Sequence, residues 1–140
     1  MKVVLDTSVI VSALRSRHGA SNRLLQLAYA RSFTTLATPA LFLEYEEVLG
    51  RDEQRSMHQM SSERISAFLI GLAAIIEPVR VYFHWRPQMQ DADDEMVLET
   101  ALNGYADMIV THNLRDFLPS ASRFNLRVVN PASLVKEVSK

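Results

Sequence analysis

MKVVLDTSVIVSAL (1–14) joins a short apolar run to a helical pattern through one carboxylate, and this transition indicates the class of fold. Residues 2–5 are typical of a strand that is buried on both faces. Apolar residues resume from about Ser8 to Leu14 with the spacing of a helix. Asp6 lies at the junction. A carboxylate at the edge of a core is costly unless a helix N-terminus, a basic side chain or a metal ion compensates its charge.

The rest of the chain alternates in the same way. Strand-like runs are predicted at residues 2–5, 33–38, 78–83, 107–111 and 126–130. Helical patterns occupy residues 8–14, 22–32, 40–50, 61–77, 91–105 and 131–139. The predicted connections are a basic loop at 15–21, a polar stretch without clear period at 51–60, a loop at 84–90, and a loop with room for one helical turn at 112–125. This alternation predicts an α/β fold: a three-layer α/β/α sandwich around a central, mainly parallel sheet.

Size and composition indicate the number of domains and exclude several classes of protein. A chain of 140 residues is expected to form a single domain, 1–140. The formal net charge of −1 excludes a protein that coats nucleic acid by bulk charge, so any such contact needs a local basic patch. The absence of cysteine excludes disulfides and cysteine-based zinc sites and fits a reducing cytoplasm. The longest apolar-rich stretch, 67–76, is too short to span a membrane.

Helical geometry separates inward-facing carboxylates from solvated ones. Glu44 borders the apolar stripe of the predicted helix 40–50, where pairing with an arginine is the plain alternative. Asp94 lies inside the apolar stripe of the predicted helix 91–105. First-turn acids also complement the helix dipole, and Asp91 is a natural N-cap, but capping accounts poorly for a carboxylate that faces the core.

Two more polar residues follow the predicted strand 107–111. Asn113 and Asp116 lie at the sheet edge where Asp6 is also expected, although a turn rich in Asn and Asp would look the same. Together, Asp6, Glu44, Asp94 and Asp116 predict a site with oxygen ligands only. Such ligands favour Mg²⁺ or Mn²⁺ over zinc, and phosphodiester hydrolysis is the chemistry that such an ion serves best.

The chain resembles PIN-domain ribonucleases, especially the VapC-like toxins of toxin–antitoxin pairs. The resemblance rests on VVLDTSVIVSAL (3–14), LFLEYEEVL (41–49), DADDEMVLETALNGYADMIVTHNLRDF (91–117) and LRVVNPASLV (126–135). It implies a parallel sheet flanked by helices and metal-dependent cleavage of single-stranded RNA by clustered acids. It also implies one or two Mg²⁺ or Mn²⁺ ions, an antitoxin partner and a homodimer.

Carried over by position, the family acids are Asp6, Glu44 and Asp94. Many members have aspartate where this chain has Asn113, and Asp116 is taken here as the fourth acid. The resemblance implies that Ser8 and Thr111 support the acids or a metal-bound water by hydrogen bonds. Alternatively, these two residues only cap a helix and form a turn.

Substrate contacts are predicted from local positive charge. Arg15, Arg17 and Arg23 form the best basic patch, and Arg115 lies in the last predicted loop, although each would also be ordinary as a surface charge. His112 lies near the predicted site. Trp85 and Phe117 are candidates for base stacking, with core packing favoured for Phe117.

Other functions compete with this interpretation. A catalytically weak or inactive binding module on the same scaffold is the main rival, and the uncharged Asn113 favours it. A phosphatase with an aspartyl nucleophile usually needs a second aspartate two residues on, where this chain has Ser8. Dinucleotide binding has little support, because no glycine-rich turn follows the first strand.

Overall fold

The central element of the molecule is one all-parallel sheet. The computed structural model describes residues 1–84, 89 and 91–139. Within this part of the chain the sheet has five strands in the order β3-β2-β1-β4-β5. The strands are β1 (Lys2–Leu5), β2 (Thr34–Ala37), β3 (Ile76–Pro78), β4 (Met108–Val110) and β5 (Arg127–Val129). The predicted parallel sheet is therefore confirmed.

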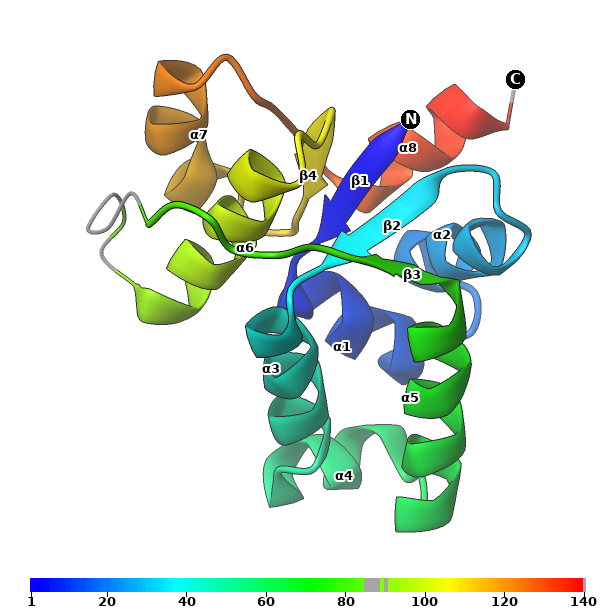
Figure 1. Cartoon of the computed structure of the whole chain (residues 1–140). Coiled ribbons are helices and arrows are strands. Elements are labelled where there is room, and N and C mark those ends of the chain that lie inside the picture. Colours follow the sequence, from blue (N-terminus) through cyan, green and yellow to red (C-terminus); the bar gives the residue numbers. More distant parts are fainter. Residues whose placement is uncertain (85–88, 90, 140) are drawn as a thin grey trace.

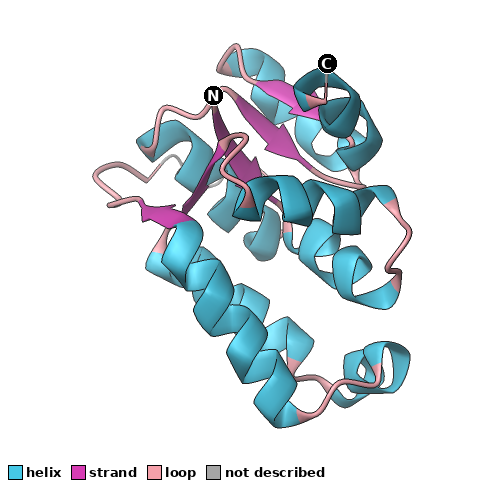
Figure 2. Ribbon diagram, turned by 90° about the vertical axis from the view of Figure 1, so that its right-hand side faces the viewer, coloured by secondary structure: helices cyan, strands magenta, loops and turns pink. Residues whose placement is uncertain are grey.

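Helices cover both faces of this sheet. The described residues form α1 (Thr7–Arg15), α2 (Ala20–Tyr29), α3 (Pro39–Leu49), α4 (Asp52–His58), α5 (Ser62–Ile75), α6 (Ala92–Asn103), α7 (Leu114–Arg123) and α8 (Pro131–Val138). Helices α1, α2 and α8 pack together on one side, and α6 packs with α7 on the other (Figure 1). The view turned by 90° likewise shows helices on both sides of the strands (Figure 2). The molecule is a three-layer α/β/α sandwich, as the sequence predicts.

The strand order places a ligand-binding edge beside β1. The first strand pairs with β2 on one side and with β4 on the other, so the direction of winding reverses at β1. Open α/β sheets bind ligands at the carboxyl ends of the strands at such a reversal. Leu5 is in register with Val110, and the Asp6 N–H donates to the Val110 carbonyl at 2.9 Å. Asp6 and Thr111 therefore leave neighbouring strands side by side.

The direction of α6 explains why a distant acid reaches the same edge. Helix α6 ends shortly before β4 begins, so it runs back along the sheet from the carboxyl ends of the strands toward their amino ends. Its first turn, which carries Asp94, therefore lies at the edge where β1 and β4 end. Helix α7 begins at the same edge, directly after β4.

The largest error of the sequence prediction is at residues 112–125. A loop with one helical turn was expected there, but Leu114–Arg123 form the ten-residue helix α7. Pro119 lies inside this helix, and a proline that lacks its N–H normally argues against a helix interior. The helix forms because it buries Phe117, Ser120 and Ala121 against the rest of the molecule.

Two further segments differ from the prediction. The polar stretch 51–60 contains the short helix α4, which buries no residue and therefore leaves no apolar period to detect. The strand predicted at 78–83 is instead β3 at Ile76–Pro78, which follows α5 directly and pairs with β2 alone, at the edge of the sheet. A proline suits such an edge, where its missing N–H breaks no pairing between strands.

Several predicted helix boundaries are confirmed by their caps. Ser61 caps α5 by accepting a hydrogen bond from the Arg64 N–H at 3.2 Å. Asp91 caps α6 by accepting from the Asp93 N–H at 2.8 Å. Gly104 follows the last turn of α6, as expected.

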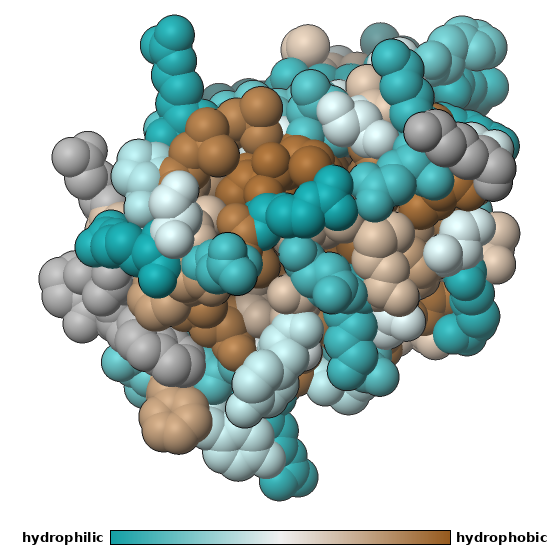
Figure 3. All heavy atoms as spheres, turned by 90° about the horizontal axis from the view of Figure 1, so that it is seen from above, coloured by the Kyte–Doolittle hydropathy of each residue, from teal (hydrophilic) through white to brown (hydrophobic). Residues whose placement is uncertain are grey.

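The core is built from the apolar strands and the inner faces of the helices. Leu5, Leu36 and Ile109 on three adjacent strands are fully buried, as are Tyr45 and Phe117 on helices. From above, hydrophobic side chains reach the surface in the middle of the face, and hydrophilic ones surround and cross them (Figure 3). Among the described helices, none has the length and apolar character needed to cross a bilayer.

Candidate active site

Asp6 is held in one orientation by two hydroxyl groups. Its side chain is 5% exposed, and Ser8 Oγ and Thr111 Oγ1 each donate to its Oδ2 at 2.7 Å. These hydroxyls in turn accept hydrogen bonds from the backbone N–H groups of His112, at 3.2 Å, and Asn113, at 2.9 Å. Within the described part of the chain no hydrogen bond reaches Asp6 Oδ1, so this oxygen is the one left for a ligand.

Asp94 lies in a group of like charges. It is half-buried in the first turn of α6, and burial raises its pKa to about 7, with further contributions from the negative charges of Asp6, Asp91, Asp116 and Asp93. Asp6 and Asp116, on two other chain segments, thus lie close enough to Asp94 for their charges to act on it. Such repulsion is relieved when a cation binds among the carboxylates.

Glu44 is buried on α3 but has different neighbours. Burial is the main cause of its raised pKa, followed by the charges of Asp93 and Glu47, while Arg51 lowers it. Asp91 adds a smaller contribution and also acts on Asp94. The structure therefore places Glu44 beside the start of α6, with its electrostatic contacts to Asp93 and Asp91 instead of Asp6.

Tyr45 fixes α3 against the end of β1. Its hydroxyl donates to the Leu5 carbonyl, directly before Asp6, and its side chain is fully buried. Burial raises the Tyr45 pKa, and the nearby Asp6 charge raises it further, so the hydroxyl stays protonated and remains a donor. The sequence pattern assigns Tyr45 to the core stripe but does not reveal this polar contact.

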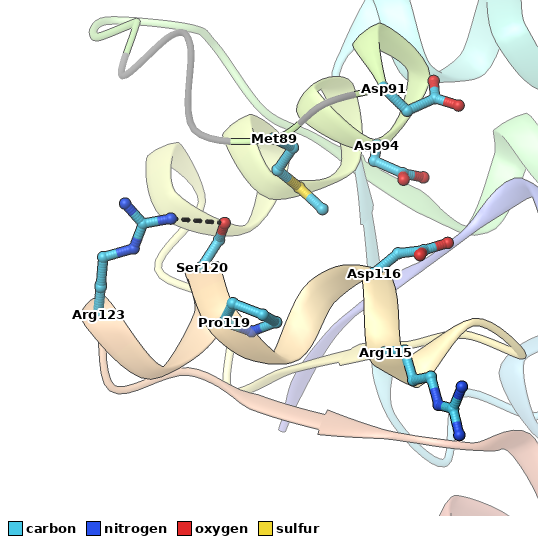
Figure 4. Close-up of a pocket in the computed structure, with 8 residues that line it drawn as sticks. All are labelled: Met89, Asp91, Asp94, Arg115, Asp116, Pro119, Ser120 and Arg123. Carbon is cyan, nitrogen blue, oxygen red and sulfur yellow. Dashed lines mark hydrogen bonds between the residues drawn. The ribbon is translucent and has the colours of Figure 1, made fainter.

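A pocket of about 620 Å³ lies between α6 and α7. It is lined by Met89, Asp91, Asp94, Arg115, Asp116, Pro119, Ser120 and Arg123. In Figure 4 the acids Asp94 and Asp116 lie at one end of the pocket and Arg123 lies at the other, with Met89 and Pro119 between them. The pocket therefore joins an acidic end to a basic end across an apolar middle.

The predicted basic residues are divided between two places. Arg115 lines the pocket, but its guanidinium points away from Asp94 (Figure 4). Arg15 ends α1, about 12 Å along the helix from its first residue, and donates to Gln54 of α4 at 2.9 Å. Arg17 is exposed just beyond it, and Arg23 is exposed on α2. Only Arg115 among these four lines the pocket.

The structure also describes Phe117, one of the two candidates for base stacking, and Asn113. Phe117 is fully buried, so core packing, the alternative that the sequence favoured, is correct. Trp85 lies outside the described residues. Asn113 precedes α7, where its carbonyl accepts from the Asp116 N–H at 3.0 Å.

The donor set fits a hard divalent cation in an open site. Within the described residues, no group of three or more His, Cys, Asp or Glu side chains is arranged to hold a metal ion. Mg²⁺ seldom needs such a group, because it keeps several waters and binds through one or two carboxylates together with substrate phosphate. Carboxylates that repel one another, one of them fixed by hydroxyl groups, meet this requirement.

His112 was expected near the site, but its partner Ser21 and the pocket residues Ser120 and Arg123 were not predicted from the sequence. His112 Nε2 lies 2.8 Å from Ser21 Oγ at the start of α2, which brings that helix to the edge of the site. Arg123 and Ser120 line the pocket from α7. They share a helix face with Asp116, but this spacing has meaning only once residues 114–123 are known to be helical.

Comparison with known families agrees with this architecture. A family model described as PIN domain matches residues 2–115, which covers most of the chain and ends one residue before Asp116. A search of curated proteins found no match.

Proposed function

Because the chain belongs to the PIN-domain family, whose members are generally nucleases, we propose that it is a metal-dependent endoribonuclease that cleaves single-stranded RNA. The observation that carries the proposal is the buried Asp6, which Ser8 and Thr111 hold by its Oδ2 at the carboxyl edge of the sheet. Asp94 lies close to it, and burial and the Asp6 charge raise the pKa of Asp94. Carboxylates held together against their repulsion at the ligand-binding edge of the sheet are suited to a divalent cation beside a phosphate.

The proposed ligands are four acids with unequal roles. Asp6 and Asp94 are the principal anchors, and Asp116 and Glu44 assist, from the pocket wall and from α3 respectively. A bound Mg²⁺ or Mn²⁺ would supply Lewis acidity toward the scissile phosphate and lower the pKa of the attacking water. Asp94 has to lose its proton when the ion binds, so metal affinity is expected to rise with pH up to about 7.

The remaining side chains orient these groups and the substrate. Ser8 and Thr111 hold Asp6 Oδ2, which turns Oδ1 toward the ligand. Arg115 on the pocket rim binds a substrate phosphate, since RNA affinity depends on cations that neutralise the backbone. Arg15, Arg17 and Arg23 would contact RNA farther from the acids.

Three partners belong to the proposal. They are single-stranded RNA, a cognate antitoxin whose chain would cover the acidic pocket, and a second copy of this protein. The exposed Ile70, 73% accessible on α5, favours an interface on that helix. Size-exclusion chromatography with light scattering would test the dimer, and Ile70→Glu is expected to weaken it.

The decisive experiment compares cleavage by wild type and by Asp6→Asn. Wild type is expected to cut single-stranded RNA when Mn²⁺ is added and to stop when a chelator is added. Asp6→Asn should lose at least a hundredfold in rate. Equal traces of activity in both proteins would indicate contamination and would favour a non-catalytic binding module.

A further inference from the structure

The basic end of the pocket is a built feature of α7. Asp116, Ser120 and Arg123 are spaced at i, i+4 and i+7 and therefore share one face of the helix. Ser120 is 3% exposed and accepts a hydrogen bond from Arg123 Nη2 at 3.0 Å (Figure 4). An arginine in a last turn often serves only the helix dipole. Here the bond to a buried serine turns the guanidinium toward the pocket, which Arg123 lines.

The distance between the two ends separates their ligands. Seven residues of helix place Arg123 about 10 Å along the axis from Asp116. The Arg123 guanidinium donates to Ser120 and lies at the end of the pocket opposite Asp116 (Figure 4), so the two side chains face separate parts of the pocket. A phosphate held beside the acids is therefore not the phosphate that Arg123 would meet.

The wall between the two ends is apolar and fixed. Met89 and Pro119 lie between Asp116 and Arg123 in the pocket (Figure 4). The Met89 N–H donates to Oε1 of Glu95 at 2.7 Å, and Glu95 is itself 5% exposed, so the methionine is tied to α6. A polarisable thioether and a proline ring provide a surface for a base without selecting its hydrogen-bonding edge.

We propose that this end of the pocket is a subsite for a nucleotide flanking the cleavage point, with Arg123 on its phosphate and its base against Met89 and Pro119. The inference rests on the proposed function for its substrate class, single-stranded RNA. It adds that RNA lies along α7 and that affinity requires at least one nucleotide beyond the scissile bond.

Salt dependence of binding tests the contact with Arg123. Each phosphate contact in a single strand contributes about 0.7 to the slope of log K against log salt, or about 2.6-fold in affinity between 50 and 200 mM salt. Binding of a labelled RNA decamer would be measured by fluorescence anisotropy in an Asp6→Asn background, which prevents cleavage. Arg123→Ala is expected to lower the slope by about 0.7, and Arg123→Lys should keep it.

The control is Arg127→Ala. Arg127 is an exposed arginine whose guanidinium pairs with Glu137 at 3.1 Å and does not line the pocket. It should leave the slope unchanged. Circular dichroism would establish that each variant folds. A slope in Arg123→Ala equal to that of Arg127→Ala would overturn the subsite.

Substrate length tests the position of the contact. In the active protein, Arg123→Ala should raise KM for the decamer with kcat nearly unchanged, and should have no effect on a dinucleotide, which lacks the flanking phosphate. An equal effect on both substrates would overturn the assignment. If the protein does not cleave RNA but Arg123→Ala still lowers the salt slope of RNA binding, the nuclease proposal is refuted and the subsite stands. Cleavage without that effect on the slope would refute the subsite alone.

Discussion

Replacing Asp94 with asparagine removes one charge from the acidic group at the start of α6 and keeps the shape of the side chain. The pKa of Asp94 is raised from 3.8 to about 7, mainly by burial and next by the charge of Asp6. A carboxyl whose pKa is higher in the folded state than in the unfolded state destabilises the fold when it ionises. The penalty is absent below about pH 4, grows between pH 4 and 7, and is complete above pH 7.

The magnitude follows from the size of the pKa shift. A shift of about three units corresponds to about 4 kcal/mol at most, at 1.36 kcal/mol for each unit. Asp94 is only partly buried, so water and salt screen its charge, and an effect of about 1–2 kcal/mol is the realistic expectation. Without metal at pH 8, Asp94→Asn should therefore be more stable than wild type by that amount, and near pH 4 the gain should disappear.

Urea denaturation in a chelator, followed by circular dichroism, measures this difference at pH 4, 6 and 8. Asp52→Asn is the matched control, because Asp52 is an exposed acid in the first turn of α4 and reports the loss of a favourable helix-dipole charge alone. The gain for Asp94→Asn should increase with pH relative to this control. A gain independent of pH, or a loss at pH 8, would show that the neighbouring charges do not destabilise ionised Asp94.

Four other measurements follow from the same contacts. Adding Mn²⁺ at a hundred times its dissociation constant should stabilise wild type by about 2.7 kcal/mol and Asp94→Asn far less, in thermal or urea unfolding. Thr111→Val removes a hydrogen bond to Asp6 and should weaken Mn²⁺ binding by about 10- to 100-fold in calorimetry, with little change in fold. Tyr45→Phe leaves a main-chain carbonyl of β1 without its donor and should cost about 1–3 kcal/mol of stability in urea. Gly104→Ala would place a methyl group 2.8 Å from a buried leucine side chain and should destabilise by about 1–3 kcal/mol, seen as a lower urea midpoint. Unchanged metal affinity in the threonine variant, or unchanged midpoints in the other two, would contradict these contacts.

The parallel sheet was predictable because its information is local. Continuous apolar runs such as residues 2–5 indicate strands buried on both faces. Capping residues such as Ser61 and Asp91 bond to backbone N–H groups two or three residues further on, so a helix start is visible in a few adjacent residues. Helical spacing also singled out Asp94, which the structure places half-buried at the pocket, whereas that spacing did not single out Glu95 and Glu99, the acids of α6 that are buried.

The failures occurred where local signals were absent or misleading. Helix α4 buries no side chain, so its sequence has no apolar period. Helix α7 contains Pro119, and only contacts with distant segments outweigh the missing backbone hydrogen bond. Because α7 was not predicted as a helix, the shared face of Asp116 and Arg123 could not be recognised.

The α/β class, the strands nearest the centre of the sheet and the side of its helix on which Asp94 lies follow from the amino-acid sequence alone, because they depend on periodicity within a few residues. Packing of the helices on the sheet brings the charges of Asp6 and Asp116 to bear on Asp94, and that of Asp93 on Glu44. It also produces the pocket that runs along α7 to Arg123. Charge repulsion and cavities depend on distances between segments far apart in the chain, and those distances are set only when the helices pack on the sheet.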